Sequence, residues 1–458
     1  EIVRGIPSAE YGNLTSGMVK IKRIARSTPF TARFKADEYS KLFSAGKGFA
    51  IGNTPHVLNA DVSYLDSKAD PRDNLEKYRR VTGSLRMNMK WHPGFADIGW
   101  NYGLDYTGSF DNQKTDPDLS YRKIDEFRSS YTRAAFTSDI SLRLNSVRMF
   151  TDFSFNASLS YEHEVIERHK QVAPQRASVA PSTMLPGVST GHYLLSEYIA
   201  DYRSDGRPFN AFLKFKAAGS LPVGVISNDY KVGIEWTISK NFGQGQVYDL
   251  RRPLSASWTS RPRVFSDIPA LQVLSLFLEE EASASIGASQ ATLRLGLRSI
   301  QLPSLPKGYY LRWRPYIDPR VNLSWDFPAL KVAGSLMSFL LTGGYGLTTR
   351  MPTVDYIFPQ EQYNDIIQLN YYDVTNPAEH SLVSIMTYVE PAINHDLRPA
   401  RNLKWELRLG WQWMGFRGSA TYFEERLRSG FRYSTVYAPY AYTQYDPSGI
   451  DGPALSAP

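Results

Sequence analysis

Residues 81–107 read VTGSLRMNMKWHPGFADIGWNYGLDYT, and this stretch decides the fold. Up to the turn at His92, Pro93 and Gly94, an apolar side chain or glycine occupies every second position; after the turn the alternation resumes in the opposite phase. A period of two is typical of β-strands, and two such strands joined by a tight turn form a hairpin. Each strand is long enough to cross an outer membrane when tilted. The apolar set is Val81, Leu85, Met87, Met89 and Trp91, then Ala96, Ile98, Trp100, Tyr102, Leu104 and Tyr106.

The same alternation recurs along the chain and predicts about fifteen strands. In residues 152–162 the polar face contains no apolar residue, which favours a wet interior over the core of a soluble sandwich. Residues 167–190 and 350–401 lack periodicity and are predicted to be irregular. Long and short connections alternate, as in outer-membrane barrels. Further strands are predicted near 31–36, 41–51, 57–65, 208–217, 230–240, 271–281, 292–302, 309–325, 336–349 and 402–412.

The composition fits strands with one apolar and one wet face. Aromatic residues make up 13% of the 458 residues, although the mean hydropathy is −0.36. No run of eighteen apolar residues occurs, which excludes helical membrane spans. The formal charge of +7 is spread along the chain, which argues against nucleic-acid binding. Because cysteine is absent, disulfides and thiolate metal sites are excluded.

The first 22 residues, EIVRGIPSAEYGNLTSGMVKIK, differ from everything that follows. They predict two short strands around a glycine-punctuated turn, which suits a small unit packed tightly against something larger. The pattern resembles the end of the plug domain of TonB-dependent outer-membrane receptors. The matching residues are Val3, Arg4, Gly5, Pro7, Glu10, Tyr11 and Gly12.

The later chain is similar to the barrel of Bacteroidetes-type members of that family. The matching pieces are a Pro-Thr-x-x-Tyr loop at 352–359, an Asn-x-x-Leu-Arg-Pro piece at 394–399, Lys-Trp-Glu-Leu at 404–407 and Thr-Tyr-Phe at 421–423. The sequence departs from the family pattern at His395-Asp396, where Pro-Asp is more usual. Together with the start of the chain, the resemblance covers nearly the whole sequence.

The resemblance implies an all-β fold, a transmembrane antiparallel β-barrel of the 22-stranded type, incomplete here, with the tail of an N-terminal plug. We expect residues 1–24 to end the plug and residues 25–458 to form the barrel, with the C-terminal strands missing. The implied function is TonB-dependent import of a glycan, peptide or metal chelate across a Gram-negative outer membrane. The implied partners are the TonB energy-transducing complex, outer-membrane lipids and, as in SusC-like systems, a SusD-like surface lipoprotein. The resemblance also implies that Arg4 pairs with Glu406 to lock the plug to the barrel.

Two other functions remain open: a passive porin-like channel, and a surface adhesin or enzyme on a barrel scaffold. No catalytic constellation or cofactor motif is present, so we expect no enzyme activity and no cofactor. His163, Glu164 and His169 lack the spacing of a helical zinc motif, and no metal is expected there. The tyrosine-rich residues 437–445 could stack on sugars, or form an aromatic girdle, which we favour.

Overall fold

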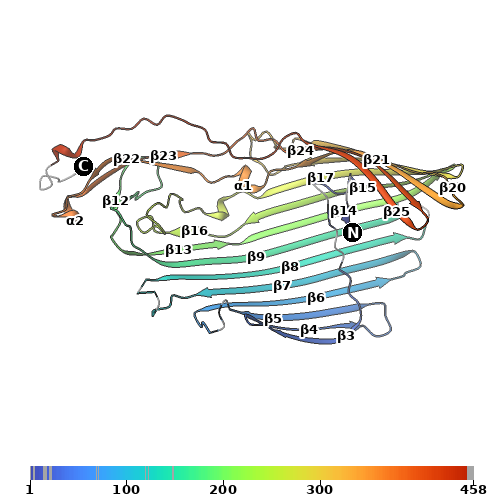
Figure 1. The fold of residues 1–458 in the computed structure, drawn as a ribbon, viewed down its shortest axis with the longest axis horizontal. Coiled ribbons are helices and arrows are strands. Elements are labelled where there is room, and N and C mark those ends of the chain that lie inside the picture. The colour runs from blue at the N-terminus through green and yellow to red at the C-terminus, as the bar shows by residue number, and fades with distance from the viewer. Residues whose placement is uncertain are drawn as a thin grey trace.

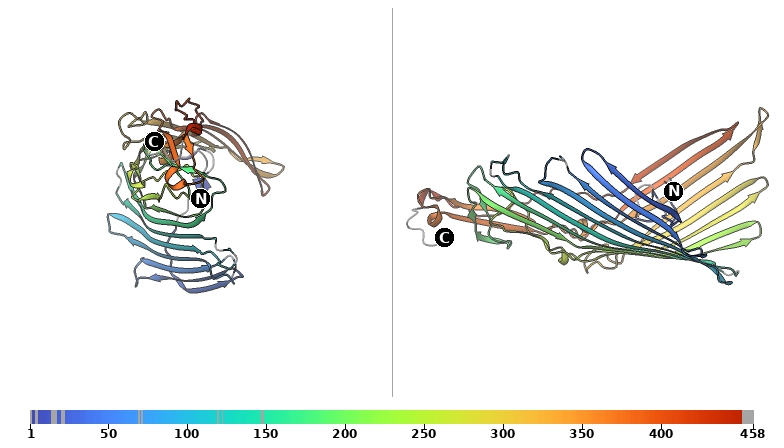
Figure 2. Two further views of the ribbon diagram at one scale, coloured as in Figure 1. Left: turned by 90° about the vertical axis from the view of Figure 1, so that its left-hand side faces the viewer. Right: turned by 90° about the horizontal axis from the view of Figure 1, so that it is seen from below.

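The computed structural model is almost entirely β-structure. It describes residues 2–3, 6–13, 18–19, 23–68, 70, 72–118, 120–121, 123–146 and 149–450. Long tilted strands lie side by side and curl around an interior (Figures 1 and 2). In the described part of the chain, no helix is long and apolar enough to cross a membrane.

The wall is one antiparallel ladder of fifteen strands within the described residues, as predicted. Each strand pairs with the next, from β3 to β25. The wall strands are β3 (Thr28–Ala36), β4 (Ser40–Ala50), β5 (Val57–Ser67), β6 (Glu76–Trp91), β7 (Ala96–Gln113), β8 (Asp125–Leu144), β9 (Asp152–Val172), β14 (Pro208–Val223), β15 (Ile226–Asn241), β17 (Leu271–Ile286), β18 (Ser289–Gln301), β19 (Tyr316–Asp326), β21 (Ser335–Arg350), β24 (Ala400–Trp413) and β25 (Phe416–Leu427).

Three shorter strands lengthen this wall. Strand β13 (Tyr198–Gly206) pairs with β9 in the same register as β14, so 198–223 lies along β9 almost without a break. Strand β16 (Gly245–Tyr248) pairs with β13, and β20 (Leu330–Val332) pairs with β21. Strands β13 and β16 therefore extend the wall at the long-loop end, and β20 extends it at the short-turn end (Figure 1).

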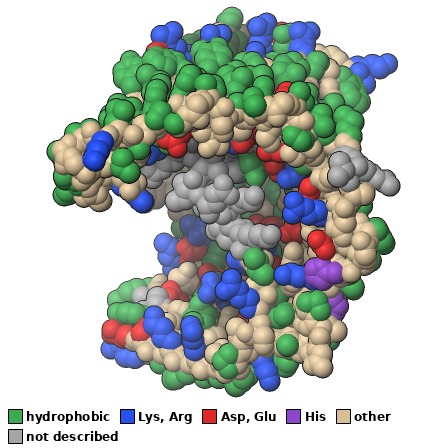
Figure 3. All heavy atoms as spheres, turned by 90° about the vertical axis from the view of Figure 1, so that its right-hand side faces the viewer, with side chains coloured by type: hydrophobic (Ala, Val, Ile, Leu, Met, Phe, Trp, Pro, Cys, Tyr) green, Lys and Arg blue, Asp and Glu red, His purple; other side chains and the backbone are tan. Residues whose placement is uncertain are grey.

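Period-two alternation gives the wall its two faces. On β17, Leu276 and Leu278 are 47% and 55% exposed on the outer face, whereas Phe277 and Glu279 between and beside them are buried inside. In the space-filling view, apolar side chains cover much of the upper outer surface, and charged side chains border the hollow (Figure 3). A wall that is apolar outside and charged inside is the pattern of a membrane-spanning barrel.

The two ends of the barrel differ as predicted. At one end the wall strands are joined by two to eight residues, for example 224–225 and 287–288. The connections at the other end include 173–197 and the longest one, 351–399. In outer-membrane barrels the short turns are periplasmic and the long loops are outside.

Two segments predicted to be irregular contain strands, so those predictions were wrong in part. Residues 167–172 continue β9, and short strands β10 (Val179–Ala180), β11 (Gly187–Thr190) and β12 (His192–Tyr193) follow. Within 350–401, β22 (Gln362–Tyr371) and β23 (Leu382–Glu390) form a hairpin that pairs with β11. A register shift between Ile367 and Leu369 interrupts the alternation of β22, which hid this strand.

Another predicted strand, 309–325, begins only at Tyr316. Tyr309 and Leu311 before it belong to a hydrophobic cluster at the long-loop end. The cluster contains Leu271, Ile300, Leu302, Leu305, Leu311, Met351, Ile357 and Phe358.

Short helices α1 (Val354–Ile357) and α2 (Pro377–His380), with 3-10 turns η1 (Phe265–Asp267) and η2 (Pro447–Gly449), complete the fold.

Candidate functional site: a segment clamped inside the barrel

Residues 6–13 form a compact turn that lies against the inner wall. The Tyr11 amide donates to the Ser8 carbonyl at 3.0 Å, which closes the turn. The Ser8 hydroxyl accepts from the Glu10 amide at 3.2 Å. Ile6, Ala9 and Glu10 are buried, at 7%, 0% and 8% exposure. Burial of these three residues shows that the segment packs against the wall.

Arg320 of β19 holds the turn by its backbone. Its Nη1 donates to the carbonyl oxygens of Pro7 at 3.2 Å, Ser8 at 2.6 Å and Tyr11 at 2.7 Å. The side chain is 2% exposed, so water does not compete for these bonds. Hydrogen bonds to a charged donor are stronger than neutral ones. Arg320 is therefore positioned to fix the shape and place of the turn.

Arg298 of β18 and Glu279 of β17 hold the next two residues. Arg298 Nη1 donates to the Glu10 carbonyl at 3.0 Å, and its Nη2 bonds Glu235 of β15 at 2.8 Å. The Ala9 amide donates to Glu279 Oε2 at 2.6 Å. The hydrogen bonds of Arg320, Arg298 and Glu279 with the segment all reach its backbone atoms, so they depend on the path of the segment more than on its side chains.

Glu10 is the side chain through which the segment binds the wall. Lys214 Nζ lies 2.6 Å from Glu10 Oε1, and the ammonium groups of Lys216 and Lys231 lie 3.4 and 3.7 Å from Oε2. Burial alone would raise the pKa of Glu10, but the hydrogen bond from Lys214 and the three positive charges together lower the pKa to about 2. Glu10 is therefore ionised at neutral pH.

Glycines of the wall make room for the segment. Ile6 packs against Gly344 and Gly346 of β21, where an added Cβ would lie 2.8 and 2.6 Å from Ile6 side-chain atoms. Ala9 packs against Gly296 of β18, where an added Cβ would lie 2.8 Å from the Ala9 Cβ. Real Cβ atoms do not come so close, so these positions need glycine for the wall and the segment to meet.

At the long-loop side the segment meets the connection after β21. The Met351 amide donates to Asn13 Oδ1 at 2.9 Å. Asn13 has a φ of +59°, a conformation that asparagine tolerates better than most residues. A hollow of about 460 Å³ lies beside this contact, lined among others by Thr237, Ser239 and Arg350.

Comparison with known proteins gives matches only among solved structures. No protein-family model and no curated protein matches the chain. The RagAB peptide transporter aligns with a TM-score of 0.51 at 12% identity, over 84% of this chain and 44% of that chain. Its closed-closed state gives a TM-score of 0.52 over the same shares. The siderophore receptor PirA from Acinetobacter baumannii aligns at 0.48 and 15% identity, over 93% of this chain and 56% of that one.

The fold of this chain is similar to the barrel of the RagAB peptide transporter. This confirms the predicted resemblance and the predicted outer-membrane β-barrel architecture. The chain spans less than half the length of the RagAB chain that it matches. At 12% identity the likeness defines the fold of the barrel and leaves its substrate open.

Four of the predicted plug-motif residues, Pro7, Glu10, Tyr11 and Gly12, lie inside this barrel. Val3 belongs to β1 (Ile2–Val3), which pairs with β2 (Met18–Val19), as the two predicted short strands require. Arg4 and Gly5 lie outside the described residues.

The predicted lock between Arg4 and Glu406 therefore stays a prediction. Glu406 of β24 is directly opposite Gly344, the residue against which Ile6 packs. Its Oε2 lies 3.7 Å from Lys404 Nζ. Glu406 is thus on the luminal face, as the alternation predicted, and close to the position of the segment.

The sequence analysis did not single out the residues that hold the described segment. Arg298, Arg320, Glu279 and Lys214 all occupy luminal positions of strands that were predicted near their correct places. Each is a charged residue next to an apolar, outward-facing one, and this alternation was the signal in the sequence that placed it in the lumen. Pattern alone cannot show which luminal charges meet the segment, because strand neighbours are set by the barrel.

The histidines and tyrosines noted in the sequence lie elsewhere. His163 Nε2 is 3.4 Å from Asp205, and His169 Nδ1 is 2.6 Å from Asp201. No group of three potential metal ligands occurs among the residues that the structure describes. Residues 437–445 follow the β22–β23 hairpin, where Tyr440 packs on Tyr388 at 4.6 Å. The described contacts of this stretch are with β22 and β23, and the girdle interpretation stays a prediction.

Proposed function

We propose that this chain is part of a TonB-dependent outer-membrane importer of a bulky nutrient, with residues 1–24 as the end of the plug and 25–458 as barrel wall. The observation that carries the proposal is the segment 6–13, buried in the lumen and held by Arg298 and Arg320. This segment carries the plug-motif residues Pro7, Glu10, Tyr11 and Gly12, and a passive pore needs no plug motif.

In this proposal the clamp is the fixed end of the plug. An inner-membrane motor would pull on plug residues upstream through TonB, and the force must stop where the plug is anchored. Charge-assisted bonds to buried arginines, with Glu10 held by three lysines, suit an anchor. We include the pairing of Arg4 with Glu406 as an additional anchor.

The substrate and the surface partner belong to the same proposal. RagAB transports peptides, so peptides are the first class to test, ahead of glycans and metal chelates. We propose a SusD-like lipoprotein as the partner at the long-loop end, where β11, β22 and β23 form a separate sheet.

Conductance of the full-length protein in planar bilayers separates an importer from a porin. We expect a closed barrel with no steady current, and leak currents after the double substitution Arg298→Ala/Arg320→Ala. A steady current through the unmodified protein would reject the importer in favour of the porin-like channel. Uptake of a peptide library by cells with and without a working TonB then tests active import, and equal uptake would contradict it.

The anchor can be tested in the same protein because the chain contains no cysteine. A Cβ built at Gly344 lies 3.5 Å from the Ile6 Cβ, within the range for a disulfide. We expect Ile6→Cys/Gly344→Cys to import equally well oxidised and reduced, because a fixed end need not move. The matched control is the single variant Ile6→Cys, because Gly344→Cys alone would bring a Cβ against the Ile6 side chain. Import that stops on oxidation and returns on reduction would show that the segment moves.

A further inference from the structure

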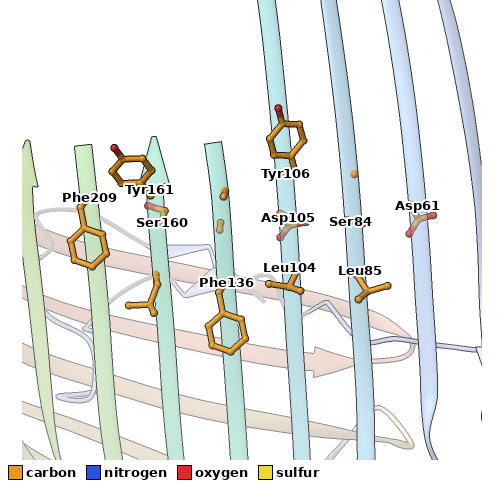
Figure 4. Close-up of a pocket in the computed structure, with 14 residues that line it drawn as sticks. Asp61, Ser84, Leu85, Leu104, Asp105, Tyr106, Phe136, Ser160, Tyr161 and Phe209 are labelled. Atoms are coloured by element: carbon orange, nitrogen blue, oxygen red, sulfur yellow. The ribbon is translucent and has the colours of Figure 1, made fainter. Parts of the chain in front are cut away.

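Two hollows lie one above the other on the outer face of β6 to β9. The lower hollow, of about 560 Å³, is seen close up in Figure 4. Gly83, Tyr106 and Ala134 of its lining share the outer face of the sheet, because Tyr106 is paired with Gly83 on one side and Ala134 on the other. Tyr106 and Tyr161 are both 46% exposed, although they lie in the middle of the wall. This is the face that meets lipid.

Small residues create the lower hollow. Gly83 and Ala134 alternate with the two tyrosines across the strands, since Ala134 is paired with Tyr161 in turn. The gaps between the rings have the shape and chemistry to take a hydrocarbon chain. Apolar side chains continue the hollow, namely Leu85, Leu104, Phe136, Leu159 and Phe209.

The upper hollow, of about 590 Å³, has a different chemistry. Its lining includes the cationic residues Lys77, Arg79, Lys114 and Arg128. Lys77 and Arg128 flank Asn112 on adjacent strands, so they form one row across the sheet. Asn112 lies six positions after Tyr106 on β7, so the two side chains point to the same, outer face. Lys77 and Arg128 share this face because they are paired with Asn112.

Carboxylates in and around the upper hollow leave part of its positive charge available. Glu167 is paired with Arg203 at 2.9 Å, and Arg79 lies 3.8 Å from Asp66 outside the hollow. Asp111 alternates to the luminal side. Among the described residues, Lys77, Lys114 and Arg128 have no carboxylate within 4.0 Å, and Glu126 is the one outward carboxylate of the lining without such a partner. Three available cations therefore face one available anion.

The spacing of the two hollows matches the layers of a membrane. Asn112, in the middle of the upper row, lies six positions after Tyr106 on β7. At about 3.4 Å per residue and a tilt of about 45°, this places the upper row about 14 Å farther along the membrane normal. Tyrosines favour the interface between hydrocarbon and headgroups. The flexible lysine and arginine side chains can then reach back into the headgroup layer.

We propose that this face binds a phosphate-bearing lipid of the outer leaflet, with an acyl chain in the lower hollow and its phosphate on Lys77, Arg128 and Lys114. The upper hollow lies at the long-loop end of the barrel, which is the outer end in barrels of this kind. Basic pockets beside membrane-spanning elements bind anionic lipid headgroups through the same charge complementarity. The site is independent of any transport function.

The test is the amount of lipid phosphorus that stays bound to the full-length protein after purification in mild detergent. We expect Lys77→Glu/Arg128→Glu to lower it at least about fivefold. The matched control, Lys331→Glu/Arg417→Glu, reverses two charges near the short-turn end and should retain the lipid. Folding of every variant is checked by the mobility shift of the unheated barrel in detergent gels. Unchanged lipid phosphorus in Lys77→Glu/Arg128→Glu would overturn the proposal.

A second variant tests the acyl-chain part without touching a charge. A Cβ added at Gly83 meets no atom within 4 Å, so Gly83→Leu should fold while its side chain fills the lower hollow. We expect a comparable loss of bound lipid phosphorus. Retention of the lipid in Gly83→Leu, with loss in the charge-reversal variant, would mean that only a phosphate is recognised, and would reject a lipid site.

Discussion

The luminal faces of β14 to β21 and of β3 to β9 are both polar, but their charges have different partners. On β14 to β21, Arg298 and Arg320 donate to backbone carbonyls of the segment 6–13. On β6 to β9, Arg86 pairs with Asp105 at 2.6 Å and Arg133 with Glu162 at 3.2 Å. These second pairs join neighbouring strands of the wall itself.

The charges on β14 to β21 therefore have partners in the segment 6–13, whereas those on β6 to β9 have partners within the wall. Arg298 and Arg320 are buried at 1% and 2% exposure, so removal of the segment would take acceptors away from two buried cations. The side chain of Arg133 is 41% exposed and needs no such partner. The luminal face of β14 to β21 is therefore the part of the barrel built around the segment.

The largest expected effect comes from removing a clamp arginine. Arg320→Met should free the segment at a cost of about 3–5 kcal/mol, because three carbonyls lose the hydrogen bonds of a buried charged donor. The matched change Arg133→Met should cost about 0–1 kcal/mol, since that pair is half exposed. Hydrogen exchange of residues 6–13, followed by mass spectrometry of the full-length protein, measures both. Equal exchange in the two variants would break the distinction between the two faces.

A smaller effect is expected at Glu10. Glu10→Gln leaves three lysines facing an uncharged side chain, and the lowered pKa of Glu10 corresponds to about 3 kcal/mol. Glu162→Gln on the opposite face removes one partner of a partly exposed pair and should change little. The same exchange experiment compares them. Protection of residues 6–13 that survives Glu10→Gln would mean that the backbone clamps suffice.

The glycine contacts should contribute less again. Gly296→Ala brings a Cβ against Ala9 and should cost about 1–3 kcal/mol through overpacking. At Gly103, on the other luminal face, the near contact is the Thr137 hydroxyl at 2.9 Å, which can rotate away. We expect Gly103→Ala to leave both stability and exchange of the segment unchanged. Thermal unfolding of the two variants provides the measurement, and an equal loss would contradict the close fit at Gly296.

The effect of pH should be absent near neutrality. The pKa of Glu10 in the folded protein, about 2, lies below its usual value of 4.5. Its ionised form therefore stabilises the clamp fully above about pH 4.5, and this stabilisation is lost as the pH falls toward 2. Titration of the Glu10 carboxyl by carbon NMR measures it, and a midpoint near 4.5 would show that the lysines do not hold the carboxylate. In Lys214→Met the midpoint should rise.

Much of the wall could be predicted from alternation, because an apolar outer face and a wet inner face are written into every second residue. Strands β6 and β7 were predicted from this pattern together with their turn. The β22 strand was missed because a register shift interrupts its period of two. The strand predicted at 309–325 was too long at its start, because Leu311 packs into a hydrophobic cluster and the strand begins at Tyr316.

In the candidate site, the residues of the short motif could be predicted from the sequence, and their partners on the wall could not. Pro7, Glu10, Tyr11 and Gly12 were recognised in the sequence, because a short motif keeps its residues together.

The sequence by itself determined the faces of the strands, the turn of the segment and the hairpins, since these depend on neighbours within a few positions. Only the tertiary structure decided that Glu10 meets Lys214, that Arg320 binds the Pro7, Ser8 and Tyr11 carbonyls, and that Ile6 fits against Gly344. These partners lie 200 or more positions apart in the chain. The curl of the wall brings them together, and no local pattern records which strand will face the segment.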